Sequence, residues 1–450
     1  MSLSLGAMVD MAVDSQRTPT PGSSAPLEGK ARIQSIDTLR GVALLGILLM
    51  NIIAFANPFA AYLIPTVDGA DTGINLATYM TMDIFVEGSM RAIFSMLFGA
   101  GMLIFLNKPN SDPAVVKRLY YRRTLFLVAF GLFNAYALLW LGDILYAYGM
   151  TGLLLYLFRD MPPKKLVQMS IGVLLLLTLV HSSGYYRASS LGEAVAEIEA
   201  LPVGTEYTEE QREVLVAWDA FLEEQFVAAE LVEQQLQMMR SGYVTNLVNA
   251  APINLILQTV GLLGNSFWDA LSMMLLGMAF MKWGLLDGSR SLRVYGSMAL
   301  VGLGIGLPLN TWESLVFVNS GFDLAWSAFN RPTYDLGRMS LAIGYIGVVM
   351  VICKLGILRW LQFLLARVGQ MALTNYLSHS LICNFVFMGW GLGLAGQLER
   401  YQIYYVVLGI WIFQLITSPI WLRYFRFGPA EWLWRTLTYE SAQPLRIEAR

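Results

Sequence analysis

Apolar runs of membrane-spanning length recur along most of the chain, and they restrict its fold more than any other feature. Hydrophobic residues make up 56% of the 450 residues and charged residues only 14%, against about 25% charged in a typical soluble domain. Each run approaches the ~20 residues that a helix needs to cross the hydrocarbon layer. The alternating pattern of a membrane β-barrel is missing, so helices must satisfy the backbone hydrogen bonds inside the membrane.

The sequence therefore predicts an all-α fold, a polytopic membrane helix bundle with about ten transmembrane helices. The predicted spans cover residues 39–57, 80–106, 122–140, 144–158, 166–183, 266–286, 293–309, 336–356, 369–391 and 401–422. One further apolar stretch, 244–263, is ambiguous. If it does not cross, 23 of the 30 Lys and Arg residues lie on one side, as the positive-inside rule favours. We therefore expect a re-entrant or interfacial segment there and both termini in the cytoplasm, although crossing by 244–263 stays open.

Five segments follow from this arrangement. Residues 1–34 are expected to form a flexible cytoplasmic tail, and 428–450 a cytoplasmic C-terminal tail. Residues 35–183 hold the first five transmembrane helices and 266–427 the last five. Between them, 184–265 forms a small extracytoplasmic helical insertion that contains 12 of the 32 acidic residues. It is expected to pack as a cap on the outer ends of the bundle, or alternatively to form a separate binding module.

Three predicted helices carry polar side chains to a similar depth in the membrane. At 1.5 Å per residue, Asn51, Arg91 and His379 lie ~15–18 Å from the starts of the first, second and ninth helices. Glu87 precedes Arg91 by four residues, a spacing that allows an ion pair on one helix face. A charged group in hydrocarbon costs at least ~2.5 kcal/mol, so this polar centre is the candidate catalytic site.

Each of these four residues has a chemical interpretation and a structural one. His379 could accept a proton, Asn51 and Arg91 could hold a carbonyl or a developing oxyanion, and Glu87 could orient Arg91. Alternatively, Glu87 and Arg91 form a self-neutralising structural pair, His379 is an interhelical hydrogen bonder, and Asn51 only packs between helices.

Four further residues are candidates for substrate binding. Asn375 and Tyr376 lie beside His379 in the sequence, and Asp37 and Arg40 lie at the cytoplasmic membrane edge, where they could fix the access route. The alternatives are helix packing for Asn375 and capping or snorkelling for the Asp37–Arg40 pair.

A basic run at the start of the third span is the candidate donor-binding site. It contains Lys117, Arg118, Arg122 and Arg123, and it could receive a phosphate-bearing cytosolic donor such as a coenzyme A thioester. The alternative is that these charges only set the topology.

Other polar residues carry weaker signals. Asp143 is expected to cap the next helix, Asp335 and Arg338 to pair with each other, and His181 to lie at the membrane interface. The two cysteines offer no metal-ligand spacing, so no metal site is predicted.

Four ordered blocks of the sequence resemble the YeiB-like family of uncharacterised bacterial inner-membrane proteins. The blocks are Asp37-Thr38-Leu39-Arg40-Gly41 through Asn51, residues 139–145 (LWLGDIL), residues 369–376 (GQMALTNY) and residues 428–435 (GPAEWLWR). That family looks like a relative of the transmembrane acyltransferases, which include the lysosomal heparan glucosaminide acetyltransferase and the bacterial envelope-glycan O-acyltransferases. The resemblance implies a ten-helix acyltransferase-like bundle in the bacterial inner membrane.

The sequence departs from those acyltransferases at the positions of their histidines. The O-acyltransferases carry an essential His where this chain has Asn51, and family members often have a His where this chain has Asn134. The glucosaminide acetyltransferase has a His in the following outer loop, whereas residues 57–79 here contain none, and Tyr62 is the nearest match. Only His379 lies in a block that aligns with a comparable His, so acyl transfer would need His379 or a carboxylate as its base.

These observations predict an acyltransferase-like membrane protein that moves an acyl group from a cytosolic thioester to an envelope sugar, lipid or small molecule. The alternatives are a transporter or lipid flippase with a polar binding site in mid-membrane, and a non-catalytic scaffold. No tightly bound cofactor is expected, and acyl-CoA would act as a co-substrate. The expected partners are membrane lipids, the acyl donor and the envelope acceptor, with no nucleic acid; the oligomeric state is left open.

Overall fold

The computed structural model describes residues 34–107, 112–202, 204–224, 229–326 and 331–447. Helices dominate these residues, and no β-strand is formed among them apart from an isolated bridge between Phe425 and Arg446. The predicted all-α bundle is therefore confirmed. Of the predicted N-terminal tail, residues 1–33 lie outside the described part of the chain.

Seven helical segments within the described residues are long and apolar enough to cross a membrane. They are α2 (Gln34–Ala56), α4 with α5 (Gly73–Phe85 and Ser89–Leu106), α8 (Pro163–Glu199), α11 with η5 and α12 (Tyr243–Ile256, Leu257–Ser266 and Phe267–Lys282), α13 (Leu292–Asn319), α14 (Tyr334–Leu355) and α17 (Arg400–Tyr424).

The other three predicted spans also fall on helices. They correspond to α6 with the π-helical η3 (Pro113–Leu132 and Phe133–Ala137), to the shorter α7 (Ile144–Leu155) with η4 (Tyr156–Phe158), and to α15 with α16 (Arg359–Gln370 and Ala372–Phe387). Helices of this length and composition are those of a membrane protein.

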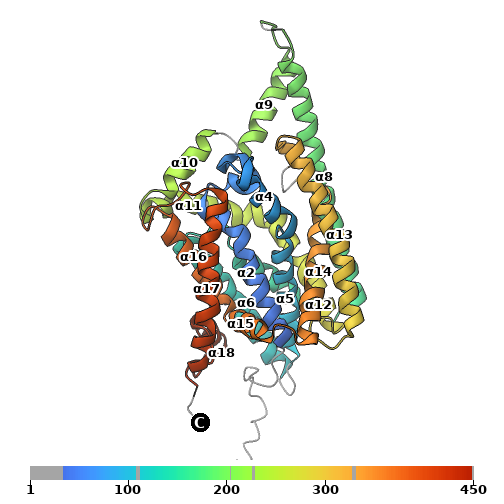
Figure 1. Ribbon diagram of the computed structural model, residues 1–450, viewed down its shortest axis with the longest axis vertical. Helices are drawn as coiled ribbons and strands as arrows, with labels where there is room; N and C mark the ends of the chain where they lie inside the picture. Colours follow the sequence, from blue (N-terminus) through green and yellow to red (C-terminus); the bar gives the residue numbers. More distant parts are fainter. Residues whose placement is uncertain (1–33, 108–111, 203, 225–228, 327–330, 448–450) are drawn as a thin grey trace, which may run out of the picture.

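Several helix ends differ from the sequence prediction. The predicted second helix is interrupted at residues 86–88, where Gly88 adopts a positive φ of 67°, a conformation open to glycine at little cost. The stretch 244–263 is no separate segment, because it continues through η5 into α12 as one helical segment of 40 residues. In Figure 1 the yellow-green ribbon of α11 crosses the bundle and does not run parallel to the long axis of α17.

The two ends of the bundle carry different extra elements. At one end, α8 extends beyond its predicted limit and continues into the insertion helices α9 (Glu209–Glu224) and α10 (Ala229–Met239), drawn at the top of Figure 1. We call this the insertion end. At the other, the terminal end, α2 begins and α18 (Pro429–Tyr439) lies beneath α15 and α17. Within the predicted C-terminal tail, Pro429–Tyr439 thus form an ordered helix.

Glycines bring pairs of helices into backbone contact. A Cβ atom on Gly277 of α12 would meet the carbonyl oxygen of Met96 in α5, and one on Gly99 of α5 would meet that of Met274. Between α2 and α15, Gly41 and Gly369 are equally close to the opposite backbone. Since larger side chains would force these helices apart, the glycines decide which polar residues can meet across them.

Candidate functional site

Among the described residues, two large cavities penetrate the bundle, one towards each end. The basic cavity, of about 300 Å³, lies towards the terminal end. It is lined by the start of α2, by α5, by the middle of α6, by the end of α15 and by α18. The polar cavity, of about 640 Å³, lies in the half nearer the insertion and is lined by α2, α5, α7, α8 and η5. Tyr148 lines both cavities.

Four arginines line the basic cavity, with only two carboxylates among them: Arg40, Arg123, Arg426 and Arg435, with Asp37 and Glu431. Arg40 Nη1 lies 3.0 Å from Asp37 Oδ1. The guanidinium of Arg123 lies over the Trp434 ring at 3.7 Å, and it is near enough to Arg40 and Arg435 to be repelled by their charges. This concentration of positive charge is suited to a ligand with several phosphates.

Glu431 fastens α18 to the rest of the bundle. Its carboxylate accepts hydrogen bonds from the backbone amides of Leu373 and Thr374 and from the Thr374 hydroxyl. Burial raises the pKa of Glu431, against the lowering effect of these hydrogen bonds. The arrangement caps the start of α16 and places Trp434 and Arg435 at the cavity mouth.

The predicted donor-binding run reaches this cavity through a single residue. Only Arg123 of the four lines it. Arg122 pairs with Glu440, while Lys117 and Arg118 are exposed on α6. Three of the cavity's four arginines come instead from α2 and the C-terminal region.

A chain of buried charges runs along one side of the polar cavity. Arg91 Nε lies 3.2 Å from Asp269 Oδ2, and Asp269 also pairs with Arg338 of α14. Arg338 Nη2 lies 2.5 Å from Asp335 Oδ1, so the predicted Asp335–Arg338 pair is present. The chain ends where Asp335 Oδ2 lies 3.1 Å from Nδ1 of His181. Of these residues, Arg91, Asp269 and His181 line the cavity.

Asn51 lies on the wall of the same cavity. Its side chain is half-buried and makes no hydrogen bond to any other residue that the structure describes. A polar side chain at membrane depth without a protein partner is available to a ligand. Asn51 and Arg91 therefore line the same cavity.

The predicted ion pair between Glu87 and Arg91 does not form. The break at residues 86–88 removes the helical i, i+4 geometry, and Arg91 pairs with Asp269 instead. Glu87 accepts hydrogen bonds from the hydroxyls of Tyr62 (2.8 Å) and Tyr334 (2.9 Å). Tyr334 also accepts one from Arg91 at 3.0 Å, so Glu87 supports Arg91 through a tyrosine from behind the cavity wall.

His379 lines neither cavity. It is 1% exposed, and its Nε2 lies 3.1 Å from Oε1 of Gln414 in α17. Residue counting predicts the height of a side chain in the membrane, but not the direction in which it points from its helix. The structural alternative, a hydrogen bond between helices, describes the observed position of His379.

The two predicted neighbours of His379 differ in their surroundings. Asn375 is buried and donates to the Val368 carbonyl and the Ser418 hydroxyl, both at 3.1 Å. Tyr376 lines the basic cavity, and its hydroxyl accepts hydrogen bonds from Nε1 of Trp140 and the amide of Ile144, both at 3.2 Å.

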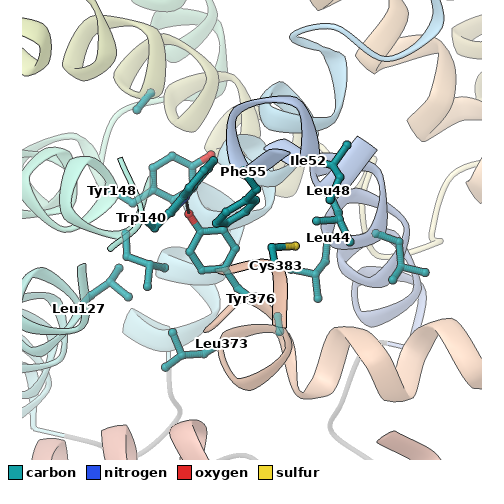
Figure 2. Close-up of a cluster of buried hydrophobic side chains, with 14 of the residues drawn as sticks. Leu44, Leu48, Ile52, Phe55, Leu127, Trp140, Tyr148, Leu373, Tyr376 and Cys383 are labelled. Atoms are coloured by element: carbon teal, nitrogen blue, oxygen red, sulfur yellow. Dashed lines mark hydrogen bonds between the residues drawn. The ribbon is translucent and has the colours of Figure 1, made fainter. Parts of the chain in front are cut away.

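An aromatic layer separates the two cavities. Trp140 lines the polar cavity and Tyr376 the basic one, so their hydrogen bond crosses the layer. Phe55 stacks on Trp140 with ring centroids 3.7 Å apart. Figure 2 shows these rings gathered beside Tyr148. The barrier is two side chains thick at the Trp140–Tyr376 contact and one side chain thick at Tyr148, which lines both cavities.

Comparison with known proteins places the chain in a family. Residues 280–441 match a family described as a protein of unknown function, DUF418. The uncharacterised protein YeiB of Escherichia coli K12 is 32% identical over 423 residues, which cover 91% of this chain and 97% of that protein. The chain belongs to the YeiB family. The uncharacterised protein YxaH of Bacillus subtilis 168 is 27% identical over 431 residues, 94% of this chain and 98% of that protein.

Of the two cavities, the matched region of this YeiB-family chain lines only the basic one. It contains Asp335 and Arg338 of the charge chain and the arginines of the C-terminal region. Asn51, Arg91 and His181 precede it in the sequence.

His181 is one of the site residues, with Asp269 and Tyr148, that sequence analysis of this YeiB-family chain missed. It was expected at the membrane interface, yet it is buried beside Asp335 on the cavity wall. The sequence contains one signal for this contact. His181 and Asp335 both lie at the outer ends of predicted spans, so they are expected at a similar depth, as Asn51 and Arg91 are. Asp143, by contrast, caps α7 through the Tyr146 amide as predicted.

Proposed function

We propose that this protein is a membrane acyltransferase that carries an acyl group from a cytosolic thioester in the basic cavity to an acceptor hydroxyl in the polar cavity. The observation that supports this most strongly is that Tyr148 lines both cavities. A donor held at the terminal end could extend its acyl group past Tyr148 to meet an acceptor from the other side. In this proposal the terminal end faces the cytoplasm and the protein lies in the bacterial inner membrane.

The charge of the basic cavity suits an acyl-CoA. The phosphates of coenzyme A would lie among Arg40, Arg123 and Arg435 at the mouth, where guanidinium groups bind phosphate oxygens in pairs. Deeper in the cavity, Phe94, Leu97 and Phe98 form an apolar wall. That wall suits the pantetheine arm and the acyl chain, which carry no charge.

His181 takes the role of proton acceptor in place of His379. With Nδ1 facing Asp335, Nε2 is left to face the cavity that the ring lines. As the acceptor oxygen attacks the thioester carbon, Nε2 removes its proton, and the Asp335 carboxylate stabilises the imidazolium that results. The new carbon–oxygen bond replaces the carbon–sulfur bond, and the imidazolium returns the proton to the departing thiolate.

Asn51 and Arg91 would stabilise the charge that develops on the thioester oxygen. Both line the cavity that contains His181, and Asp269 and Tyr334 hold the Arg91 guanidinium in place. Preorganised donors of this kind commonly lower a barrier by about 3 kcal/mol each.

The thin aromatic layer also suits a transporter, the second candidate. A substrate could pass between the cavities if the Trp140–Tyr376 contact opened. In that case a labelled solute would accumulate in vesicles without any chemical change, whereas an acyltransferase would release free thiol.

The experiment that separates the two uses the full chain in proteoliposomes made from a bacterial lipid extract. Radiolabelled acetyl-CoA is added on the side of the terminal end, and both thiol release and label in the lipid or glycan fraction are followed. Protein-dependent thiol release matched by label in a product supports the acyltransferase. Label that enters the lumen unchanged, with no thiol released, would contradict it.

A further inference from the structure

The polar cavity reaches the outer surface of the bundle between α8 and η5. Its lining includes exposed residues on both elements, namely Val180, Ser183 and Arg187 of α8 and Gly264 and Ser266 of η5. Val180 is 51% exposed. A cavity whose walls include surface residues on two neighbouring elements has an opening between them.

The opening lies above a close contact between the same two helical segments. Near the terminal end, Ser170 of α8 donates to the carbonyl of Ser272 in α12 at 2.8 Å, and Lys282 donates to the carbonyls of Arg159 and Met161. Above this contact, α8 and the η5 stretch that precedes α12 both contribute lining residues to the cavity. At this level the cavity, and not a direct packing contact, lies between α8 and η5.

The opening faces the bilayer rather than water. The α8 surface just below it carries the exposed residues Leu175, Leu176 and Leu179. Lys164 and Lys165 mark the membrane edge at the start of α8, and a hydrocarbon core of ~30 Å spans about 20 residues of helix from there. Arg187 therefore lies close to the opposite edge, at the level of the lipid phosphates.

One face of α8 leads from this edge to the proposed proton acceptor. His181, Gly184 and Arg187 recur every three residues and all line the cavity, so they lie on one side of the helix. Six residues correspond to an axial distance of ~9 Å. Within the described part of the chain, Arg187 has no carboxylate at ion-pair distance, which leaves its guanidinium available to a phosphate.

We propose that the acceptor is a phosphate-bearing membrane lipid that enters sideways between α8 and η5. Its tail lies in the opening, its phosphate binds Arg187, and the hydroxyl of its headgroup reaches His181. That this lipid acts as an acyl acceptor rests on the proposed acyl transfer. Lipid binding at the opening, however, can be measured without any turnover.

The test uses the full chain in phosphatidylcholine vesicles that contain a small amount of phosphatidylglycerol with a photoactivatable diazirine in its tail. After illumination, labelled peptides are mapped by mass spectrometry. We expect labelling to concentrate on α8 and η5. Gly264→Trp should remove most of it, because a side chain at Gly264 meets no other atom within 4 Å and can fill the opening.

Two matched controls accompany the test. Gly304 of α13 is equally exposed and equally free of neighbours but does not line the cavity, so Gly304→Trp should leave the labelling unchanged. Arg187→Ala should weaken labelling by phosphatidylglycerol about tenfold, as expected for a lost charge-assisted hydrogen bond, while Arg212→Ala, on the exposed α9, should not.

Three results would overturn the proposal. Label could spread over all lipid-facing helices in proportion to their exposure, or it could persist in Gly264→Trp. Alternatively, soluble glycerol 3-phosphate could suppress it, which would identify a small free anion as the ligand. If labelling behaves as expected and thiol release is absent, the lipid site stands and the proposed acyl transfer fails.

Discussion

Nδ1 of His181 in α8 lies 3.1 Å from Oδ2 of Asp335 in α14. A histidine oriented by a buried carboxylate, with its other nitrogen towards a cavity, is the arrangement by which enzymes take protons from hydroxyl groups. Asp335 is in turn paired with Arg338, which keeps the carboxylate charged and in place.

Arg338 should be essential for stability, because it neutralises two carboxylates inside the bundle. Replacing Arg338 with Met leaves Asp269 without one of its two arginines and Asp335 with no arginine partner. Breaking a buried ion pair in this way costs about 3–5 kcal/mol, which thermal unfolding in detergent would report as a large loss. Arg212→Met, at an exposed pair with Glu209, is the control and should change the free energy of unfolding by less than about 1 kcal/mol.

Donor binding should depend on which arginines line the basic cavity, not on the basic run as a whole. Arg123→Ala should weaken coenzyme A binding about tenfold, the loss expected for one charge-assisted phosphate contact. Arg118→Ala, on the same helix but exposed and outside the cavity, should leave it unchanged. Titration calorimetry measures both, and equal losses in the two variants would indicate a diffuse electrostatic effect.

The layer between the cavities should weaken when Tyr376 loses its hydroxyl. Tyr376→Phe leaves Nε1 of Trp140 and the Ile144 amide without their acceptor. An unsatisfied buried donor costs about 1–3 kcal/mol, so the variant should unfold at a lower temperature than wild type. Tyr121→Phe is the matched control, since the Tyr121 hydroxyl makes no hydrogen bond to another described residue. Equal stability of the two variants would count against the observed contact.

Asp68 should make stability depend on pH at the insertion end. This carboxyl lies at the end of the 3-10 helix η2 (Pro65–Asp68), where it accepts hydrogen bonds from Arg400 (2.8 Å) and Asn57 (3.1 Å). Burial raises its pKa from about 3.8 to about 6, with Arg400 acting in the opposite direction. The folded protein therefore binds this proton more tightly than the unfolded chain does, and stability falls as pH rises from about 4 to about 6.

The size of this effect is bounded by the pKa difference, which corresponds to about 3 kcal/mol at most. Asp68→Asn should abolish this part of the slope in thermal unfolding measured across that pH range. A slope that is identical in wild type and Asp68→Asn would assign the pH dependence to another group.

The sequence predicts the helical bundle because the apolar residues of each span follow one another along the chain. Each predicted span falls on a helix of the structure. Asn51 and Arg91, which residue counting predicts to lie at a similar depth, line the same cavity. The direction in which a side chain points from its helix axis depends on packing against neighbouring helices. It cannot be predicted by counting residues along the chain. His379 contacts Gln414 and lines neither cavity.

Two other departures have local causes that the sequence only partly displays. The Glu87–Arg91 pair requires an unbroken helix, and Gly88 interrupts it. The basic cavity draws Arg426 and Arg435 from the C-terminal region, because Glu431 anchors α18 to the start of α16. Contacts between segments so distant in the sequence depend on the tertiary fold.

The chain contains only two histidines, and comparing their alanine variants tests the account most directly. The measurement is transfer of label from acetyl-CoA to product in proteoliposomes, with thermal unfolding of each variant as the check on folding. We predict that His181→Ala lowers the rate by about 10²–10⁴-fold, the usual contribution of a general base, whereas His379→Ala loses stability but keeps its rate. Full activity in folded His181→Ala, or loss of activity confined to His379→Ala, would contradict the account.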